Sequence, residues 1–327
     1  MIYIISQHRE TATDEVVAYC IQEKMQIIRI DYEDMPIQNL TITISEEKSD
    51  YNIVHLNKEL SVDQKDILWF RRGSIRFEYP IKAKILSETC TNFLKEEYDY
   101  ISESYYTIPF SISSYQADPA NNKLNNFIYA KQVGLKIPAT IVTSNKKDAL
   151  AFLQKHEFCI SKPLNNAHLD GKLIGELSIA SKGTFKVNEN DLLKLDDTFV
   201  PMLIQQYIPK IFELRIFYFM EKFYPMAIFS QKDEKTAIDY RNYNLEKENR
   251  CVPYTLPDNI INSLKKFIDK SQLKTGSFDL IYSTDDNYYF LEVNPNGQFS
   301  WVSDNCNYYI EKDIAHKLNA LHNGNQQ

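Results

Sequence analysis

The sequence predicts a mixed α/β protein built of three lobes, and three observations support that prediction. The chain has 327 residues, more than one hydrophobic core usually organises. Hydrophobic residues make up 43% of the chain and charged residues 25%, the composition of an ordinary globular protein. Apolar runs of strand length alternate with stretches of helical period, first as a strand–helix–strand unit and later as hairpins.

The first lobe is expected over residues 1–115, where a strand–helix–strand unit opens the chain. Two apolar runs flank a stretch of helical period, the pattern of a βαβ unit. A stretch at 106–121 with two prolines and several serines predicts a loop that closes the lobe. The elements expected in this lobe are strands at 2–5, 26–30, 41–45, 51–55 and 67–71 and helices at 13–24 and 82–104.

The central lobe is expected over residues 116–200. Gly134 ends its first helical pattern as a usual C′ residue, and Ser144 is the expected N-cap of the next helix. Residues 164–200 predict a β-hairpin around Gly171 and Gly183. The other elements expected here are helices at 121–133 and 145–155 and strands at 139–143 and 158–163.

The C-terminal lobe is expected over residues 201–327 and is rich in strands. A strand that begins at 201 and ends at Pro209 precedes a hairpin that turns near residues 221–222. A helix at 257–271 leads into a second hairpin at 275–295, and a last helix follows at 308–322. The whole pattern is that of an α+β arrangement with antiparallel strands in its last lobe.

The composition excludes several classes of function. A net charge of -7 disfavours a duplex nucleic-acid binder, which is usually basic. No apolar run is long enough to span a membrane, and the start "MIYIISQHRE" lacks the features of a signal peptide. The five cysteines are scattered without CxxC or zinc spacing and indicate a reducing, cytoplasmic setting. With eight glycines, any phosphate-binding loop must be poor in glycine.

The last hairpin places polar residues together at the end of two apolar strands. If its turn is centred on residues 285–286, Asp279 lies opposite Glu292 and Ser277 lies opposite Asn294. Opposed residues of an antiparallel pair share a face, so Asp279, Glu292 and Asn294 are expected to project from the same side. The other face is expected to be core, with Phe278, Leu280, Leu291 and Val293.

Two interpretations of this polar face are open. It is either a solvated acidic face, as charged surface residues usually are, or a magnesium site. Mg²⁺ binds through one or two carboxylates together with nucleotide phosphates, and two opposed carboxylates without a cation repel each other. An acid, a second acid and an amide aligned on otherwise apolar strands favour the magnesium site.

The segments "FDLIY" and "YYFLEVNPNG" resemble the metal-binding end of the ATP-grasp ligases. The resemblance implies that Asp279, Glu292 and Asn294 hold two Mg²⁺ ions against ATP. Other family segments occur in the same order. "NNKLNNFIYAKQVGLKIPATIVTSNKKDALAFL" resembles the opening of the central lobe, with Lys123 as its first nucleotide lysine, although the family usually has Asp where Asn122 stands. "FCISKPL" resembles the strand that carries the second lysine, Lys162.

The segment "LIQQYIPKIFELRIF" resembles the hinge strand of that family. The resemblance implies that ATP is bound by Gln205, Gln206, Tyr207, Ile208 and Glu213, with the backbone at 206–208 against adenine and Glu213 on the ribose. It also implies that Arg215, Arg241 and Lys162 are the catalytic residues, with the two arginines facing the γ-phosphate and the acyl group. The alternatives are a plain strand with a polar edge, solvated lysines, and for Arg241 an ion pair with Asp239.

The whole chain resembles a narrower group, the ATP-grasp maturases of graspetides. The segments that carry this are "MIYIISQHRETATDEVV", "ILWFRRGSIRF", "FSQKDEKTAIDYRNYN" and "LEVNPNGQFSWV". The resemblance implies that ATP phosphorylates Asp or Glu side chains of a ribosomal precursor peptide. Ser or Thr hydroxyls, or Lys amines, then displace the phosphate and close rings. It also implies a homodimer and a leader segment bound outside the active site, for which segment 164–187 and the nearby helices are the candidates.

Two other functions stay open at this point. One is an amino-acid ligase on the same fold that extends a peptide or protein C-terminus, and the other is a nucleotide-binding protein without catalysis. The motif "WFRRG" also has two interpretations: its arginines, Arg71 and Arg72, either bind an acidic substrate or hold the first lobe onto the next, and the structural interpretation is favoured. The segment "GQFSWV", with Trp301, is a candidate lining for the pocket that receives the peptide carboxylate.

Overall fold

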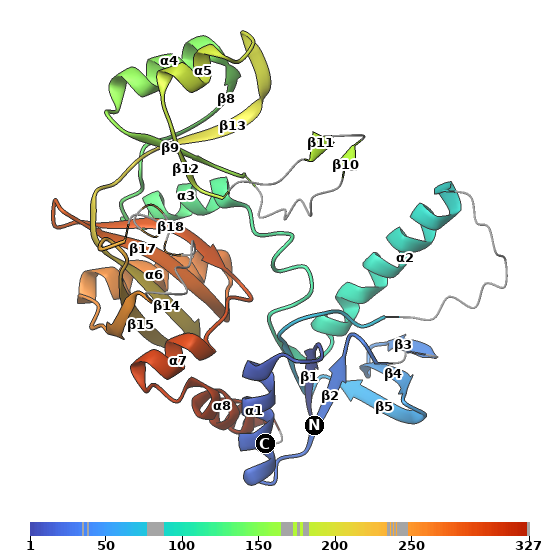
Figure 1. Cartoon of the computed structure of the whole chain (residues 1–327). Helices are drawn as coiled ribbons and strands as arrows, with labels where there is room; N and C mark the ends of the chain where they lie inside the picture. The colour runs from blue at the N-terminus through green and yellow to red at the C-terminus, as the bar shows by residue number, and fades with distance from the viewer. Residues whose placement is uncertain are drawn as a thin grey trace.

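The computed structural model describes residues 1–34, 36–37, 39–76, 88–164, 183–233, 236, 238, 240 and 248–325, together with the backbone at 173–174 and 177–178. Within this part of the chain it shows a mixed α/β protein in three bodies (Figure 1). The central lobe stands above the C-terminal lobe, and the first lobe lies beside them. The predicted fold class is confirmed.

The first lobe is built on a parallel sheet in the order β2-β1-β6-β7 and a smaller antiparallel sheet β3-β4-β5. Its strands are β1 (Ile2–Ser6), β2 (Ile27–Asp31), β3 (Leu40–Ile44), β4 (Ser49–His55), β5 (Lys58–Asp63), β6 (Ile67–Phe70) and β7 (Phe110–Ile112), and its helices are α1 (Thr11–Gln22) and α2 (Glu88–Thr107). The βαβ opening is confirmed, because β1 and β2 pair in parallel around α1.

The structure differs from expectation where the first lobe ends. Helix α2 continues to Thr107, and β7 lies inside the stretch expected to be a loop. Ile112 pairs with Trp69 of β6 and is fully buried. Burial of its apolar side chain therefore favours a strand here, although the neighbouring serines are typical of a loop. Strand β5 was also not expected, and residues 82–87 of the expected long helix lie outside the described residues.

The central lobe has an antiparallel sheet in the order β12-β9-β13-β8. Its elements are α3 (Lys123–Gln132), β8 (Thr140–Asn145), α4 (Lys146–Lys155), β9 (Cys159–Lys162), β12 (Phe185–Val187), α5 (Glu189–Leu193) and β13 (Thr198–Gln206). The short pair β10 (Leu173–Ile174) and β11 (Leu177–Ser178) forms a separate antiparallel hairpin. Gly183 lies beyond this hairpin, and Gly171 is outside the described residues.

Two details of the central lobe depart from the sequence prediction. The N-cap of α4 is Asn145 rather than Ser144, because the Asn145 side chain accepts a hydrogen bond from the Asp148 amide. Strand β13 pairs with β8 at Thr198 and from Met202 to Gln205, and with β9 from Leu203 to Gln206. The sheet of this lobe therefore reaches Gln206, past the expected boundary at 200.

The C-terminal lobe is a five-stranded antiparallel sheet in the order β16-β15-β14-β17-β18. Its elements are β14 (Lys210–Phe219), β15 (Lys222–Phe229), β16 (Arg250–Pro253), α6 (Asp258–Ser271), β17 (Thr275–Ser283), β18 (Tyr288–Asn294), α7 (Ser300–Cys306) and α8 (Ile310–Asn325). Both expected hairpins are present. Helix α7, which carries Trp301, was not expected.

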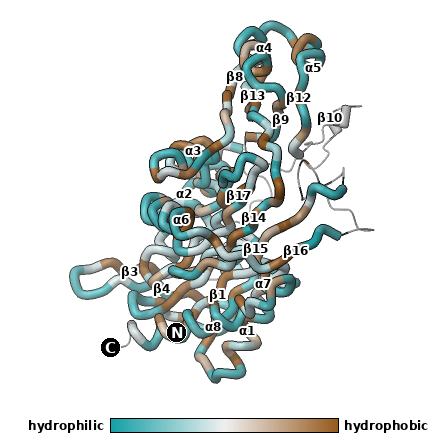
Figure 2. The backbone as a smooth tube through the Cα atoms, turned by 90° about the vertical axis from the view of Figure 1, so that its left-hand side faces the viewer, coloured by the Kyte–Doolittle hydropathy of each residue, from teal (hydrophilic) through white to brown (hydrophobic). Residues whose placement is uncertain are grey.

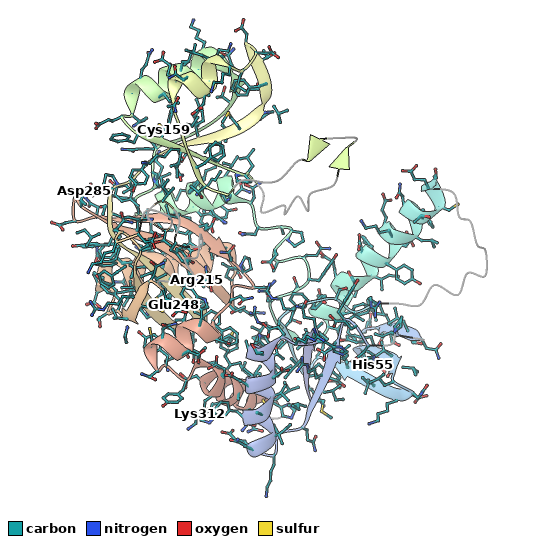
Figure 3. All side chains as sticks on the ribbon, in the orientation of Figure 1. His55, Cys159, Arg215, Glu248, Asp285 and Lys312 are labelled. Atoms are coloured by element: carbon teal, nitrogen blue, oxygen red, sulfur yellow. The ribbon has the colours of Figure 1, made fainter. Side chains whose placement is uncertain are left out.

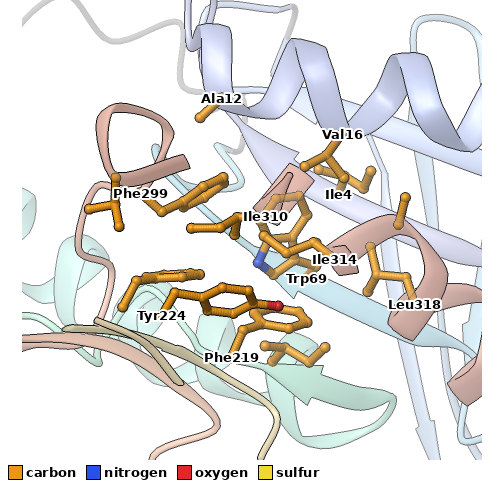
Figure 4. Close-up of a cluster of buried hydrophobic side chains, with 14 of the residues drawn as sticks. Ile4, Ala12, Val16, Trp69, Phe219, Tyr224, Phe299, Ile310, Ile314 and Leu318 are labelled. Carbon is orange, nitrogen blue, oxygen red and sulfur yellow. The ribbon is translucent and has the colours of Figure 1, made fainter. Parts of the chain in front are cut away.

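The two faces of this C-terminal sheet serve different purposes. One face packs on α3 and α6 around Leu214, Ile216, Phe278 and Phe290. The opposite face is aromatic at one end, where Phe219 and Tyr224 meet Trp69 of the first lobe and helices α1, α7 and α8 (Figure 4). At its other end this face carries Glu213, Arg215 and Asp279. The first lobe therefore covers the apolar end and leaves the polar end for a site.

The hydropathy of the chain follows this arrangement. Strands such as β1 and β4 carry hydrophobic segments, whereas hydrophilic residues predominate at outlying turns such as the one beyond β3 (Figure 2). None of the described helices combines the length and apolar character needed to cross a bilayer.

Candidate nucleotide- and metal-binding site

The last hairpin brings the predicted polar residues together. Asp279 pairs with Glu292 and Ser277 pairs with Asn294, as expected. The position of the turn differs from the expected one. The Ser283 amide donates to the Asn287 carbonyl, so the turn is centred on Asp285 rather than between residues 285 and 286. A one-residue shift between Asp279 and Leu280 then compensates for the earlier turn.

That shift is a β-bulge at Leu291, and it corrects one expectation. Leu280 pairs with Phe290 rather than Leu291, so Phe290 occupies the core position on the apolar face. Leu291 instead lines the same cavity as Glu292 and Asp279. An extra residue in one strand changes which side chains share a face, and a count from the turn cannot detect it.

The metal-ligand candidate Asp279 is bound to Arg215. The Arg215 Nη1 donates to both carboxylate oxygens, at 2.9 and 3.1 Å, and both residues are almost completely buried. Burial alone would lower the pKa of Arg215, but Asp279 and its surroundings outweigh it, so the pKa of Arg215 is raised. Figure 3 labels Arg215 on the C-terminal sheet, below the central lobe.

The second acid, Glu292, faces Lys123 at the start of α3. The Lys123 Nζ lies 3.7 Å from Glu292 Oε2 and donates to the Pro163 carbonyl at 3.2 Å. Each buried carboxylate therefore has a cation beside it, which explains why two acids can sit opposite each other. Asn122 caps α3, because its side chain accepts from the Leu124 and Asn125 amides. An Asp at this position would make the same cap, so the departure at Asn122 leaves this local structure unchanged.

A loop follows the metal-ligand candidates and passes close over the sheet. Gly297 lies in this loop, where a Cβ would meet the Ser277 Cβ at 2.3 Å. No larger residue fits without displacing strand β17. The glycine of "NPNG" is thus explained by close packing of the loop against the strand that carries Asp279.

A cavity lies between the central sheet and the C-terminal sheet, and it collects most of the predicted nucleotide residues. It is lined by residues of β9, β13, β14, β17 and β18. The predicted residues in its wall are Lys162, Gln205, Gln206, Tyr207, Ile208, Glu213, Asp279 and Glu292. Residues that are far apart in the sequence, from Ile160 to Glu292, thus line a single cavity.

The hinge that joins β13 to β14 forms one wall of this cavity. The Gln206 amide donates to the Ala139 carbonyl and the Tyr207 amide to the Phe158 carbonyl, both at 2.8 Å. The fully buried Gln205 donates from Nε2 to Thr140 Oγ1. Its Oε1 has no hydrogen-bond partner among the described residues, so a buried acceptor remains for a ligand with an N–H group.

The ribose candidate Glu213 belongs to a buried polar cluster that sequence reasoning missed. Lys210 Nζ donates to Glu213 Oε1 at 2.6 Å and to the Ile238 carbonyl at 3.1 Å. Ser230 Oγ donates to the same Glu213 oxygen at 2.7 Å. Regular alternation along β14 would point Lys210 away from Glu213, but the register shifts between Lys210 and Phe212. The sequence has no signal for that shift.

A second cavity adjoins the first on the side of the first lobe. Its charged lining residues are Arg72, Asp118, Lys123, Arg215 and Glu292, and Asn294 also faces it. Glu292 lines both cavities, so the metal-ligand candidates stand where the two meet. The remaining predicted catalytic residue, Arg241, lies outside the described residues.

Solved structures similar to this one cover nearly its whole length. No protein-family model matches the chain, and no curated protein does. A RiPP-associated ATP-grasp ligase from Chryseobacterium gregarium, in complex with ADP and a leader and core peptide, is 27% identical. Its TM-score is 0.80, with 97% of this chain and 96% of that chain covered.

Two further structures agree. The macrocyclase MdnC from Microcystis aeruginosa MRC, bound with precursor peptide MdnA, is 25% identical with a TM-score of 0.74, covering 97% of this chain and 99% of its own. The ATP-grasp ligase PsnB, complexed with minimal precursor, Mg and ADP, is 15% identical, with a TM-score of 0.71 and 98% of both chains covered; that likeness concerns the fold. The chain has the fold of the ATP-grasp ligases, and over nearly its whole length it is similar to enzymes of the graspetide type.

Proposed function

We propose that this ligase macrocyclises a ribosomal precursor peptide at the expense of ATP. One observation carries the proposal: Glu292 lines both the cavity between the two sheets and the second cavity beside it. A nucleotide in the first cavity and a peptide side chain in the second would meet at this residue. A site that only bound a nucleotide would have no need of the second cavity at that position.

The reaction proceeds in two steps. A carboxylate oxygen of a peptide Asp or Glu attacks the γ-phosphorus of ATP, and ADP leaves with the electron pair of the broken P–O bond. A Ser or Thr hydroxyl, or a Lys amine, then attacks the acyl carbon of the acyl phosphate, loses its proton and expels phosphate. Each ring therefore consumes one ATP and removes the elements of one water from the peptide.

The nucleotide is assigned to the cavity between the sheets. The hinge at 205–208 would hold adenine, and the buried Gln205 Oε1 is a ready acceptor for its amino group. Glu213 would bind the ribose hydroxyls, held in place by Lys210 and Ser230. Lys123 and Lys162 would bind phosphate oxygens as point charges, because both border the cavities beside Glu292.

Two Mg²⁺ ions are assigned to Asp279, Glu292 and Asn294. These side chains fit the ion, since they offer hard oxygens at adjacent positions of one strand pair. When bound, Mg²⁺ neutralises charge on the β- and γ-phosphates. Arg215, which is bonded to Asp279, borders the second cavity and would steady the transferring phosphoryl group with Lys162 and Arg241.

The leader of the precursor is assigned to segment 164–187. The short hairpin of β10 and β11 lies in this segment, away from the central sheet (Figure 1), and the rest of 165–182 is outside the described residues. Deleting the hairpin should weaken precursor binding and leave ADP binding intact. Unchanged precursor affinity would refute this assignment. The five free cysteines support a reducing, cytoplasmic setting, and the homodimer rests on the family resemblance.

Mass spectrometry of a candidate precursor peptide encoded beside the gene of this ligase, incubated with the enzyme, ATP and Mg²⁺, tests the function. Ring closure predicts the loss of one water for each ring. An amino-acid ligase would instead add the mass of an amino-acid residue, and a non-catalytic binder would leave the mass unchanged. Either of these two results would overturn the proposed macrocyclisation.

A further inference from the structure

Two adjacent arginines after strand β6 enter different surroundings. Arg71 is 3% exposed, and its Nη1 donates to the carbonyls of Asn296 and Gly297, at 2.7 and 3.3 Å. Its Nη2 lies 3.1 Å from Glu10 Oε1, and its guanidinium covers the Phe299 ring. Arg71 therefore holds the first lobe onto the loop behind the metal-ligand candidates, as the structural interpretation of "WFRRG" predicts.

Arg72 has a different position, on the wall of the second cavity. It is only partly buried, and it lines that cavity with Lys123, Arg215, Glu292 and Asn294. Of the described residues that line this cavity, Arg72 alone belongs to the first lobe, so it faces the C-terminal site from the opposite lobe. The structural interpretation of the motif does not account for this residue.

The backbone fixes where Arg72 stands. Its amide donates to the Ile5 carbonyl at 3.3 Å. The next residue, Gly73, has a φ of +70°, and a Cβ there would lie 2.6 Å from the Ser6 carbonyl oxygen and 2.7 Å from the Tyr32 Cβ. Only glycine accommodates both constraints. The chain thus turns sharply after Arg72. The backbone of Arg72 is held between the buried Arg71 and this turn.

The other charged side chains that the structure describes in the wall of the second cavity already have partners. Lys123 faces Glu292, and Arg215 holds Asp279. Asp118 accepts from the backbone and side-chain nitrogens of Asn296, at 3.3 and 3.1 Å. Among the described residues, no carboxylate lies within ion-pair distance of Arg72. Arg72 is thus a cation that borders the cavity and is available to a ligand.

We propose that Arg72 is the positioning residue for the peptide carboxylate that is to be phosphorylated. This rests on the proposed function and names the ligand of its second cavity: an Asp or Glu side chain of the precursor core. An incoming carboxylate is repelled by Glu292 and Asp118, and a cation on the opposite wall offsets that repulsion. The planar guanidinium also binds a carboxylate through two parallel hydrogen bonds, which orients the side chain as well as attracting it.

A double-mutant cycle on peptide binding separates this role from a structural one. The full-length enzyme, wild type or Arg72→Gln, is titrated in the presence of ADP and Mg²⁺ with two labelled peptides. One is the candidate precursor encoded beside the gene of this ligase, and the other is the same peptide with its core Asp and Glu residues replaced by Asn and Gln. Neutralising the core should weaken binding to the wild type about tenfold, the size expected for one charge-assisted contact, and should barely change binding to Arg72→Gln.

Three controls make the outcome decisive. Arg72→Lys, which keeps the charge without the fork, should restore part of the discrimination. Lys58→Ala removes an exposed cation of the same lobe and should discriminate like the wild type. The affinity for ADP should be the same in all variants, because Arg72 is not in the wall of the nucleotide cavity.

The results distinguish the two proposals. If Arg72→Gln weakens binding of both peptides equally, it still discriminates between them about tenfold. Arg72 then does not bind the carboxylate and the inference is wrong, but macrocyclisation by the wild type is unaffected by that result. If the wild type neither binds nor cyclises the precursor, the proposed function fails, and this inference fails with it. In the expected case, Arg72→Gln also raises KM for the precursor more than it lowers kcat.

Discussion

Two buried arginine–carboxylate pairs, Arg215–Asp279 and Arg71–Glu10, look alike and lie in different regions. Burial is the largest influence on both arginines and lowers the pKa in each case. For Arg71 it prevails against Glu10, and the pKa falls to about 10. For Arg215 the double contact with Asp279 and the charge of nearby groups, Glu292 among them, prevail, and the pKa is raised.

The difference shows how the two regions are built. The interface pair is a single cation and a single anion sealed between lobes, with Arg71 also bonded to backbone carbonyls. The site places two acids opposite each other on adjacent strands, each with its own cation, at the border of cavities. Similar ion pairs therefore fasten lobes in one place and border the proposed metal site in the other. The neighbouring acid and the access to a cavity distinguish the second pair from the first.

The largest effect expected from this contrast is on catalysis. Glu292→Gln removes one charge from the metal-ligand candidates and should reduce ring formation by about 100-fold or more, the scale seen when a charge-stabilising group is lost from an active site. Its melting temperature should stay close to that of the wild type. Rates are measured by mass spectrometry of the precursor. The exposed Asp258→Asn, in the same lobe, is the control and should be fully active; full activity of Glu292→Gln would remove Glu292 from the site.

The next effect concerns stability at the interface. Arg71→Met leaves the buried Glu10 without its cation and should lower the free energy of unfolding by about 3–5 kcal/mol, measured in urea. Adding Glu10→Gln to this variant should recover part of the loss, because the unpaired charge is then gone. Losses that simply add in the double variant would show that the two side chains are not coupled.

An intermediate effect is expected from ligand binding. With Mg²⁺ and ADP at about 100 times the dissociation constant, the folded protein should gain about 2.7 kcal/mol, seen as a rise in melting temperature. EDTA should remove the magnesium-dependent part. Asp279→Asn should abolish that part and retain the stabilisation by ADP alone, whereas Arg71→Met should keep both. A magnesium response in Asp279→Asn equal to that of the wild type would contradict the metal assignment.

The smallest effect tests the departure at Asn122 beside the site. Asn122→Ala removes the cap of α3 and should cost about 1 kcal/mol of unfolding free energy, while Asn122→Asp should change it by a few tenths at most. Urea denaturation of both variants measures this. Equal losses in the two variants would mean that the side-chain oxygen of residue 122 does not cap the helix that begins at Lys123.

Much of the fold followed from patterns that the chain carries locally. The opening strand–helix–strand unit and the two hairpins of the last lobe were predictable, because apolar period and turn residues are local properties. Strand β7 was missed, since its burial depends on a neighbour, Trp69, that is distant in sequence. Helix α7 was missed as well, and it packs against the first lobe's core.

The site was predictable to the extent that it depends on order and alternation. Glu292 and Asn294 share a face by alternation along β18, whereas the count that placed Asp279 opposite Glu292 is right because the bulge at Leu291 compensates for the earlier turn. The family resemblance named residues that line the cavity, such as Lys162 and Glu213. Lys210 could not be found in this way. Its place beside Glu213 depends on an irregularity in β14, and the bulge at Leu291 is of the same kind. Local backbone shifts of one residue are set by packing on both faces of the sheet.

The sequence by itself determined a mixed α/β fold with two acids and an amide near the ends of two adjoining strands, because apolar period and strand alternation depend on residue order. Only the tertiary structure decided which charges neutralise one another and which face a cavity. The motif "WFRRG" shows the reason. Its two arginines are neighbours with the same chemistry, but one is sealed against Asn296, Gly297 and Phe299, and the other borders the cavity beside Glu292. Charge pairing depends on distances between lobes, which no local pattern encodes.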